Sequence, residues 1–233
     1  MVQEVVAIID RSGSMSGKEA DTIGGINTTI NELKNNRDNE IIKFSLKFFD
    51  HEEYIKIRSV NIEDVIPLNI TDLVPRGQTA LLDALGTTIS FFINKKMYDP
   101  NSYDTCVIYV ATDGLENMSK KFKYIDIKNL IEEAKKYSIE ILYLGANQDA
   151  ILEASKFGLD AEQAINYDEN AENIESAYCS AARVAKRYRS GSSPNFLNVE
   201  RVASVKPEKV DSVQDKTDNS PKFLIPRRFA SVR

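Results

Sequence analysis

Two short, uninterrupted apolar runs constrain the fold of this chain more than any other feature of its sequence. Residues 5–9 read Val-Val-Ala-Ile-Ile, and residues 106–111 read Cys-Val-Ile-Tyr-Val-Ala. Runs of this length that are rich in β-branched residues are typical of strands buried on both faces. Such strands need helices on either side of their sheet, so the two runs predict a layered α/β architecture.

Helical and strand patterns alternate along the rest of residues 5–188. Four segments carry apolar residues at helical spacing. These residues are Ile23, Ile26, Ile30 and Leu33; Leu81, Leu85, Ile89 and Phe92; Ile127, Leu130, Ile131 and Ala134; and Ile174, Ala177, Tyr178, Ala181, Val184 and Ala185. Residues 139–144 form another strand run, followed by a short helix over 149–156 and a short strand near Ile165. We therefore predict a doubly wound, Rossmann-like α/β fold with a mostly parallel sheet and helices on both faces.

One pair of predicted strands departs from this pattern. Residues 42–49 alternate apolar and polar side chains, which predicts a strand with one wetter face. Residues 50–53, Asp-His-Glu-Glu, read as a hairpin turn into a second strand over residues 54–57. We expect this pair to form the antiparallel edge strand that many mostly parallel sheets carry.

The sequence changes character near residue 189. We predict an α/β domain over residues 1–188 and a largely flexible C-terminal extension over residues 189–233. Residues 190–194 read as a linker, and residues 216–221 are polar without any period. The last segment, residues 222–233, mixes Phe and Leu with four cationic residues and is either a docking peptide or a frayed tail.

Composition excludes several classes of protein. The formal net charge of −5 argues against a nucleic-acid-binding protein, which usually carries a basic face. No run of about 18 apolar residues is present, and the N-terminus lacks a basic signal region, so we expect a cytoplasmic protein without a membrane partner. Two distant cysteines, Cys106 and Cys179, and a single histidine argue against disulfides and against a zinc site. The sequence leaves the oligomeric state open.

The run over residues 5–9 leads directly into Asp10-Arg11-Ser12-Gly13-Ser14. One carboxylate and two hydroxyls thus follow the C-terminal end of a strand, the edge where open α/β sheets bind their ligands. Gly13 allows the tight curl that turns both serines inward. Hard oxygen ligands on one loop suit Mg²⁺, which prefers octahedral oxygen coordination.

Two distant segments supply further candidate ligands. Thr79 precedes a predicted helix, where threonine is also a common N-cap. Asp113 follows the strand over residues 106–111, so it lies at the same edge of the sheet as Asp10, although an Asp-Gly pair alone is more often a turn.

Together these motifs resemble the metal-ion-dependent adhesion site of von Willebrand factor type A domains. The matching positions are Asp10, Ser12, Ser14, Thr79 within Gly-Gln-Thr-Ala-Leu-Leu-Asp, and Asp113 within Thr-Asp-Gly. Residues 21–27, 145–149 and 183–189 further resemble stand-alone domains of this family from bacteria, phages and large viruses. The resemblance extends over residues 1 to about 203.

The resemblance implies a specific chemistry. In this family the two serines and the threonine ligate the cation, while the two aspartates often act through water, so few anionic ligands contact the metal directly. One coordination position is left for an Asp or Glu of a protein partner. We therefore expect a protein-interaction module that uses Mg²⁺ (or Mn²⁺), with Asp10, Ser12, Ser14, Thr79 and Asp113 as the metal site and without catalytic residues.

The alternative is a Mg²⁺-dependent hydrolase or phosphoryl-transfer enzyme that uses the same metal. The sequence offers no general base or nucleophile with an orienting partner near the motif, and it lacks the phosphate-binding Gly-x-x-x-x-Gly-Lys-Ser/Thr pattern. A Ser-His-Asp arrangement would require His51, which we expect in a surface turn away from the site. We therefore predict that the protein is not an enzyme.

Four residues follow strand ends, and three of them have two interpretations. Glu116 and Asn117 either rim the metal site or lie in a solvated loop. Gln148 and Asp149 follow the strand over residues 139–144 on the same edge, and Asp149 is equally typical of a helix N-cap.

Three charged residues near the motifs are similarly open. Arg11 and Arg76 either steer an acidic ligand or are exposed bystanders. Asp83 either orients the loop beside Thr79 through hydrogen bonds or lies on an ordinary helix face.

Overall fold

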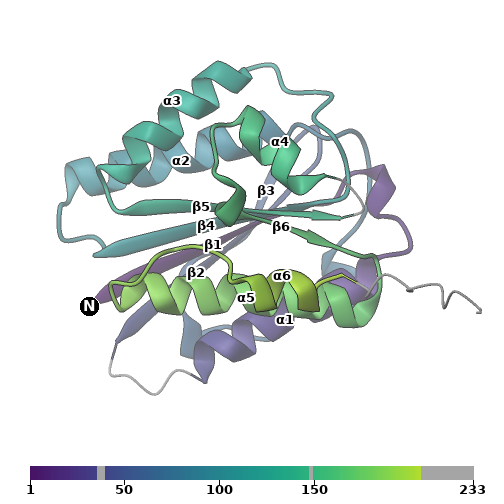
Figure 1. The fold of residues 1–233 in the computed structure, drawn as a ribbon, viewed down its shortest axis with the longest axis horizontal. Helices are drawn as coiled ribbons and strands as arrows, with labels where there is room; N and C mark the ends of the chain where they lie inside the picture. The colour runs from purple at the N-terminus through teal and green to yellow at the C-terminus, as the bar shows by residue number, and fades with distance from the viewer. Residues whose placement is uncertain (36–39, 147–148, 206–233) are drawn as a thin grey trace, which may run out of the picture.

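The centre of the molecule is a six-stranded sheet in the order β3-β2-β1-β4-β5-β6 (Figure 1). This computed structural model describes residues 1–35, 40–146 and 149–205. The strands are β1 (Val2–Asp10), β2 (Ile41–Phe49), β3 (Glu53–Asn61), β4 (Thr105–Thr112), β5 (Ile139–Ala146) and β6 (Ala164–Tyr167). The α-helices are α1 (Glu19–Lys34), α2 (Leu81–Tyr98), α3 (Tyr124–Lys135), α4 (Ala150–Lys156), α5 (Ala171–Arg189) and α6 (Asn198–Ala203).

The pairing of the strands confirms the predicted sheet. Strand β1 pairs in parallel with β2 on one side and β4 on the other, and β5 and β6 continue the parallel order. Strand β3 pairs antiparallel with β2, so the hairpin forms the expected edge. The fold is therefore the predicted doubly wound, Rossmann-like α/β architecture.

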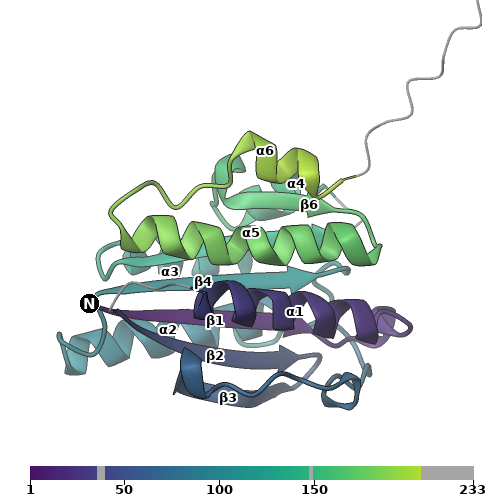
Figure 2. The ribbon, with the colours of Figure 1, turned by 90° about the horizontal axis from the view of Figure 1, so that it is seen from below.

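Helices cover both faces of the sheet (Figures 1 and 2). Helices α1, α5 and α6 lie on one face, and α2, α3 and α4 lie on the other. Alternate residues of β1 point to opposite faces because the side-chain period of a strand is two. Val5, Ala7 and Ile9 join the core beneath α1 and α5, whereas Val6 and Ile8 join the core beneath α2. The fully apolar run at residues 5–9 follows from this double burial.

A glycine allows the close packing of α1 against α5. A Cβ atom added to Gly25 would lie 2.9 Å from Cγ of Tyr178, a distance that real Cβ contacts do not reach. A Cβ atom added to the neighbouring Gly24 would have no heavy atom within 4 Å. Both glycines lie inside α1, as the sequence predicted.

Residues 190–205 pack on the domain, although their sequence predicts a largely flexible extension. Arg187 on α5 forms two hydrogen bonds of 2.8 Å with the Glu200 carboxylate on α6. Phe196 is 3% exposed in the core beside α5, and the Ser204 carbonyl accepts a hydrogen bond from the Asp168 amide. These contacts join the segment to α5 and β6. The proposed domain boundary and the tail over residues 206–233 stay predictions, because the tail lies outside the described residues.

Among the described residues, we find no helix that combines the length and the apolar character needed to cross a membrane.

Candidate functional site

The topology places the point where the chain changes direction along the sheet at the carboxyl end of β1, and we call the region between the loops there the crevice. Helix α1, which leads from β1 to β2, and helix α2, which leads from β3 to β4, lie on opposite faces of the sheet. Loops that diverge in this way leave space above the central strand, where open α/β folds place their ligands. The register aligns Asp10 with Phe49 and Ile9 with Ala111, so the loops after β1, β2 and β4 meet at this edge.

Asp10 is the buried carboxylate at the base of this crevice. Its side chain is fully buried, Oδ1 accepts a 2.7 Å hydrogen bond from the Ser12 amide, and Oδ2 accepts a 2.5 Å hydrogen bond from the Thr112 hydroxyl. Burial raises the pKa of Asp10 from 3.8 to about 6, and the hydrogen bonds from Thr112 and Ser12 limit that rise. A cation beside Asp10 would stabilise its charged form.

The two serines link Asp10 to Asp113. The hydroxyl oxygens of Ser12 and Ser14 lie 3.0 Å apart, and the Ser14 hydroxyl donates a 2.6 Å hydrogen bond to Oδ1 of Asp113. Ser12 is buried and Ser14 is exposed, so this row of oxygens runs from the interior to the rim of the crevice.

Thr79 completes the cluster from a separate loop. A Cβ atom added to Gly114 would lie 3.2 Å from Thr79 Oγ1, 3.6 Å from Ser14 Oγ and 3.9 Å from Asp10 Oδ2. Oxygens from two separate segments therefore surround one point on a third, the loop after β4, and this point is left clear because residue 114 has no side chain. The structure thus brings together Asp10, Ser12, Ser14, Thr79 and Asp113, the five residues that the sequence singled out.

The loop after β4 holds Thr79 in position. Asn117 Oδ1 accepts a 3.0 Å hydrogen bond from the Thr79 amide, and the Asn117 amide donates to the Thr79 carbonyl. Glu116 accepts hydrogen bonds from the Leu82 amide at the start of α2 and from the Ser119 amide and hydroxyl. The N-cap of α2 is Ala80, so the alternative role of Thr79 as a helix cap is wrong.

Asp83 fixes the same loop from the helix side. Its carboxylate accepts backbone hydrogen bonds of 2.8 to 3.0 Å from the amides of Lys120, Lys121 and Phe122. Asp83 therefore orients a loop through hydrogen bonds, but this loop is the one after β4 and not the segment that carries Thr79. Glu116 and Asn117 support the same loop and Thr79.

Lys18 and Glu169 lie at the site, although no sequence motif pointed to either residue. Lys18 Nζ donates a 2.5 Å hydrogen bond to Oδ2 of Asp113 and forms an ion pair with Glu169, which precedes α5. Burial lowers the pKa of Lys18, but the hydrogen bonds and charges of Asp113 and Glu169 outweigh it and raise the pKa above its ordinary value. Lys18 and Glu169 are separated by 151 positions, so no local pattern could have paired them.

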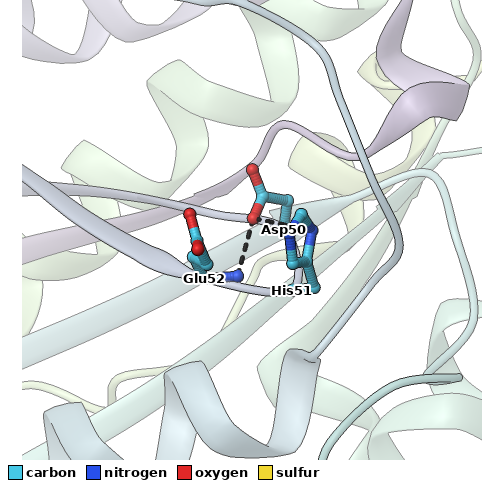
Figure 3. A group of neighbouring side chains, drawn as sticks. All are labelled: Asp50, His51 and Glu52. Carbon is cyan, nitrogen blue, oxygen red and sulfur yellow. Dashed lines mark hydrogen bonds and ion pairs between the residues drawn. The ribbon is translucent and has the colours of Figure 1, made fainter.

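A second acidic group lies in the β2–β3 hairpin (Figure 3). Asp50, His51 and Glu52 each offer a ligand atom within 4.8 Å of the others, a spacing that suits a cation. However, Asp50 Oδ2 lies 2.9 Å from Nε of both Arg11 and Arg76. Asp50 Oδ1 accepts a 2.6 Å hydrogen bond from the Glu52 amide and lies 3.3 Å from His51 Nδ1.

Two guanidinium groups thus already neutralise the hairpin carboxylates, because Arg76 also pairs with Glu52. We interpret this group as a clasp that ties the hairpin to the loops that carry Ser12 and Thr79. Arg11 and Arg76 are partners of Asp50, which is neither of the two roles considered from the sequence.

His51 lies closer to the crevice than the sequence suggested. It is an exposed hairpin residue as predicted, but a Cβ atom added to Gly77 would lie only 2.1 Å from its Nδ1. The Gly77 carbonyl in turn accepts a 3.1 Å hydrogen bond from the Gly13 amide of the metal-motif loop. The expectation that His51 lies away from the site is wrong because β2 is the direct neighbour of β1.

Asp149 is the N-cap of α4, since its side chain accepts a 3.0 Å hydrogen bond from the Leu152 amide. Gln148, the other candidate after β5, lies outside the described residues.

Comparisons with known structures identify the fold. The vWF domain of the type V pili tip protein Mfa5 from Porphyromonas gingivalis is 13% identical, with 82% of this chain and 96% of that chain covered and a TM-score of 0.57. Proximal thread matrix protein 1 from the mussel byssus is 15% identical, with 79% and 46% covered and a TM-score of 0.56. A further structure of the mussel protein, with a zinc-occupied MIDAS motif, is 15% identical, with 77% and 46% covered and a TM-score of 0.50.

The chain spans a little under half of the length of the mussel protein, so these similarities concern the fold. The search of curated proteins found no match. The family model of the von Willebrand factor type A domain matches residues 4–178, three quarters of the chain and all of the loops that form the crevice. The chain therefore belongs to the von Willebrand factor type A domain family.

Proposed function

We propose that this protein is a metal-dependent protein-interaction module. Its metal ligands are Asp10, Ser12, Ser14, Thr79 and Asp113, acting directly or through water. The convergence of Asp10, Ser14 and Thr79 oxygens around the position that a Cβ atom of residue 114 would take is the observation that supports the proposal most strongly. Membership of a family whose domains generally act in adhesion and interaction supports the same class of function.

The donor set suits a hard divalent cation. All five side chains offer oxygen, which favours Mg²⁺ or Mn²⁺ over softer metals that select nitrogen and sulfur ligands. The mussel relative carries zinc at its motif, so the metal must be tested for this chain and not assumed. Three of the five donors are neutral hydroxyls, which leaves the cation with positive charge to attract a further anionic ligand.

That further ligand is an Asp or Glu of a protein partner. The Ser14 side of the crevice is exposed, whereas Asp10 and Ser12 are buried, so a partner reaches the metal from the Ser14 rim. We propose a binding role without catalysis, because Asp10 and Asp113 are engaged with Thr112, Ser12, Ser14 and Lys18, and His51 is turned to Asp50. The cytoplasmic location stays a prediction from the sequence.

Titration calorimetry of Mg²⁺ and Mn²⁺ into metal-free protein tests the proposal. We expect saturable binding at one site, which Asp10→Ala abolishes and Thr79→Ala weakens at least tenfold. Thr71→Ala, at an exposed position of the short 3-10 helix Ile70–Asp72 that precedes α2, is the matched control and should bind as the parent does. Binding that survives Asp10→Ala would refute the ligand set.

The role of the metal in partner binding needs a second experiment. Affinity capture with the parent protein should yield a partner in Mg²⁺ that is lost both in EDTA and with Asp10→Ala. Mg²⁺-dependent phosphatase or nucleotide-hydrolysing activity that Asp10→Ala removes would instead favour the enzymatic alternative.

A further inference from the structure

Lys18 provides a fixed positive charge at the rim of the candidate metal site. Its ammonium group donates a 2.5 Å hydrogen bond to Asp113 Oδ2, while the other oxygen of Asp113 accepts from Ser14. The side chain of Asp113 is only 2% exposed, so these two contacts occupy a nearly buried carboxylate.

Glu169 keeps Lys18 in this position. It forms the second ion pair of Lys18 and comes from the segment between β6 and α5, on the far side of the crevice from the hairpin. Lys18 itself is the N-cap of α1 and retains 25% side-chain exposure, so its ammonium faces both Asp113 and the solvent at the rim. The position of the charge is therefore set by two carboxylates and by the start of a helix.

A divalent cation bound between Ser14, Thr79 and Asp10 would share Asp113 with this ammonium group. Two positive charges on one carboxylate repel each other, and in a partly buried site this repulsion is poorly screened. An incoming carboxylate at the rim would be attracted by both charges at once. The cation and the acidic ligand would then each strengthen the binding of the other, as linkage requires.

We propose that Lys18 is a specificity-determining residue that lowers the intrinsic metal affinity and couples metal binding to the arrival of a carboxylate ligand. This inference rests on the proposed metal-dependent function and adds the residue that makes the two binding events interdependent. It also defines the partner more closely, as an acidic side chain whose second oxygen accepts a hydrogen bond from Lys18.

The test is a Mn²⁺ titration of the parent protein, Lys18→Met, Lys18→Arg and Asp10→Ala, in chloride and in acetate at equal ionic strength. Acetate serves as the free carboxylate probe. Lys18→Met should bind Mn²⁺ about tenfold more tightly in chloride. A neighbouring charge commonly changes a binding equilibrium by about this factor, which for a proton corresponds to a pKa shift of about one unit. Acetate should tighten binding in the parent protein and in Lys18→Arg, and much less in Lys18→Met.

Lys136→Met is the control for net charge, because Lys136 is exposed at the C-terminal end of α3. It should match the parent protein, and thermal unfolding should show that every variant is folded. A contrary result would be that Lys18→Met binds Mn²⁺ no more tightly than the parent protein while Asp10→Ala does not bind it. That result would overturn the role of Lys18 and still support the proposed metal site. Absence of binding in both the parent protein and Lys18→Met overturns the proposed metal function itself.

Discussion

The hydroxyl of Thr112 donates a 2.5 Å hydrogen bond to Oδ2 of Asp10 and thereby joins the ends of the neighbouring strands β4 and β1. The hydroxyl oxygen of Thr112 also accepts a 3.1 Å hydrogen bond from the Gly114 amide. Thr112 therefore sets the orientation of the buried carboxylate and the turn that carries Asp113. Thr112, which is not among the proposed metal ligands, thus determines the geometry of two of them, Asp10 and Asp113.

Thr112→Val should weaken metal binding and the fold together. The variant keeps the shape of threonine but removes a hydrogen bond to a buried carboxylate, and such bonds contribute about 1.5–3 kcal/mol. We expect a loss of this size in the free energy of unfolding at pH 7, measured by urea denaturation, and weaker Mg²⁺ binding by calorimetry. Thr112→Ser, which retains the hydroxyl, should behave like the parent protein. Equal effects of both substitutions would contradict the assigned role.

The raised pKa of Asp10 predicts a pH dependence of stability for the metal-free protein. The folded pKa is about 6, above the ordinary value of 3.8, so between about pH 4 and pH 6 the folded state retains a proton that the unfolded state has released. The free energy of unfolding should therefore fall as the pH rises through this window, by about 3 kcal/mol from this group. Asp10→Asn should be more stable than the parent protein at pH 7 and similar to it at pH 4. A constant difference between the two proteins across the window would contradict this assignment.

The same titration should affect metal binding with the opposite sign. Protons compete with the cation for Asp10, so Mg²⁺ affinity should decrease as the pH falls below about 6. Calorimetry at pH 5 and pH 7.5 measures the change, and proton release on binding should be larger at pH 5. An affinity that does not vary between these pH values would indicate that the carboxylate of Asp10 does not assist the metal.

The Asp50 clasp should be important for stability and irrelevant to the metal. Asp50 is fully buried, and Asp50→Ala leaves the guanidinium group of Arg11 without its carboxylate and Arg76 with Glu52 alone, which should lower the free energy of unfolding by about 3–5 kcal/mol. The exposed pair His51→Ala and Glu52→Ala should leave metal affinity unchanged. Loss of metal binding in that double variant would move the metal site to the hairpin.

The two adjacent glycines of α1 should respond oppositely to alanine. Gly24→Ala adds a methyl group in open space and should stabilise the helix by about 1 kcal/mol, the difference in helix propensity. Gly25→Ala places a Cβ atom 2.9 Å from Cγ of Tyr178 and should destabilise the fold by about 1–3 kcal/mol through overpacking against α5. Thermal unfolding of both variants checks the pair, and two shifts of the same sign would show that α1 does not approach α5 as described.

The sequence by itself determined the fold class and the residues of the candidate site. Apolar runs such as residues 5–9 and helical stripes such as Ile23 to Leu33 are local patterns, and burial on one or both faces imposes their period directly. Asp10 and Asp113 were recognisable because each follows a parallel strand, and parallel strands bring their carboxyl ends to one edge of the sheet. Ser12, Ser14 and Thr79 were assigned to the same site because their motifs resemble those of the family.

Only the tertiary structure decided what surrounds that site. Three contacts join segments whose distance in space depends on strand order and on the path of the loops. They are the ion pair of Lys18 with Glu169, the ion pairs of Asp50 with Arg11 and Arg76, and the packing of residues 190–205 on α5. Periodicity reports which face of an element is buried, but it does not report which distant residue lies opposite. The partners of long charged side chains are the hardest to predict from the sequence. Such a side chain can reach several surface residues, so differences of a few ångströms in tertiary position decide which one it contacts.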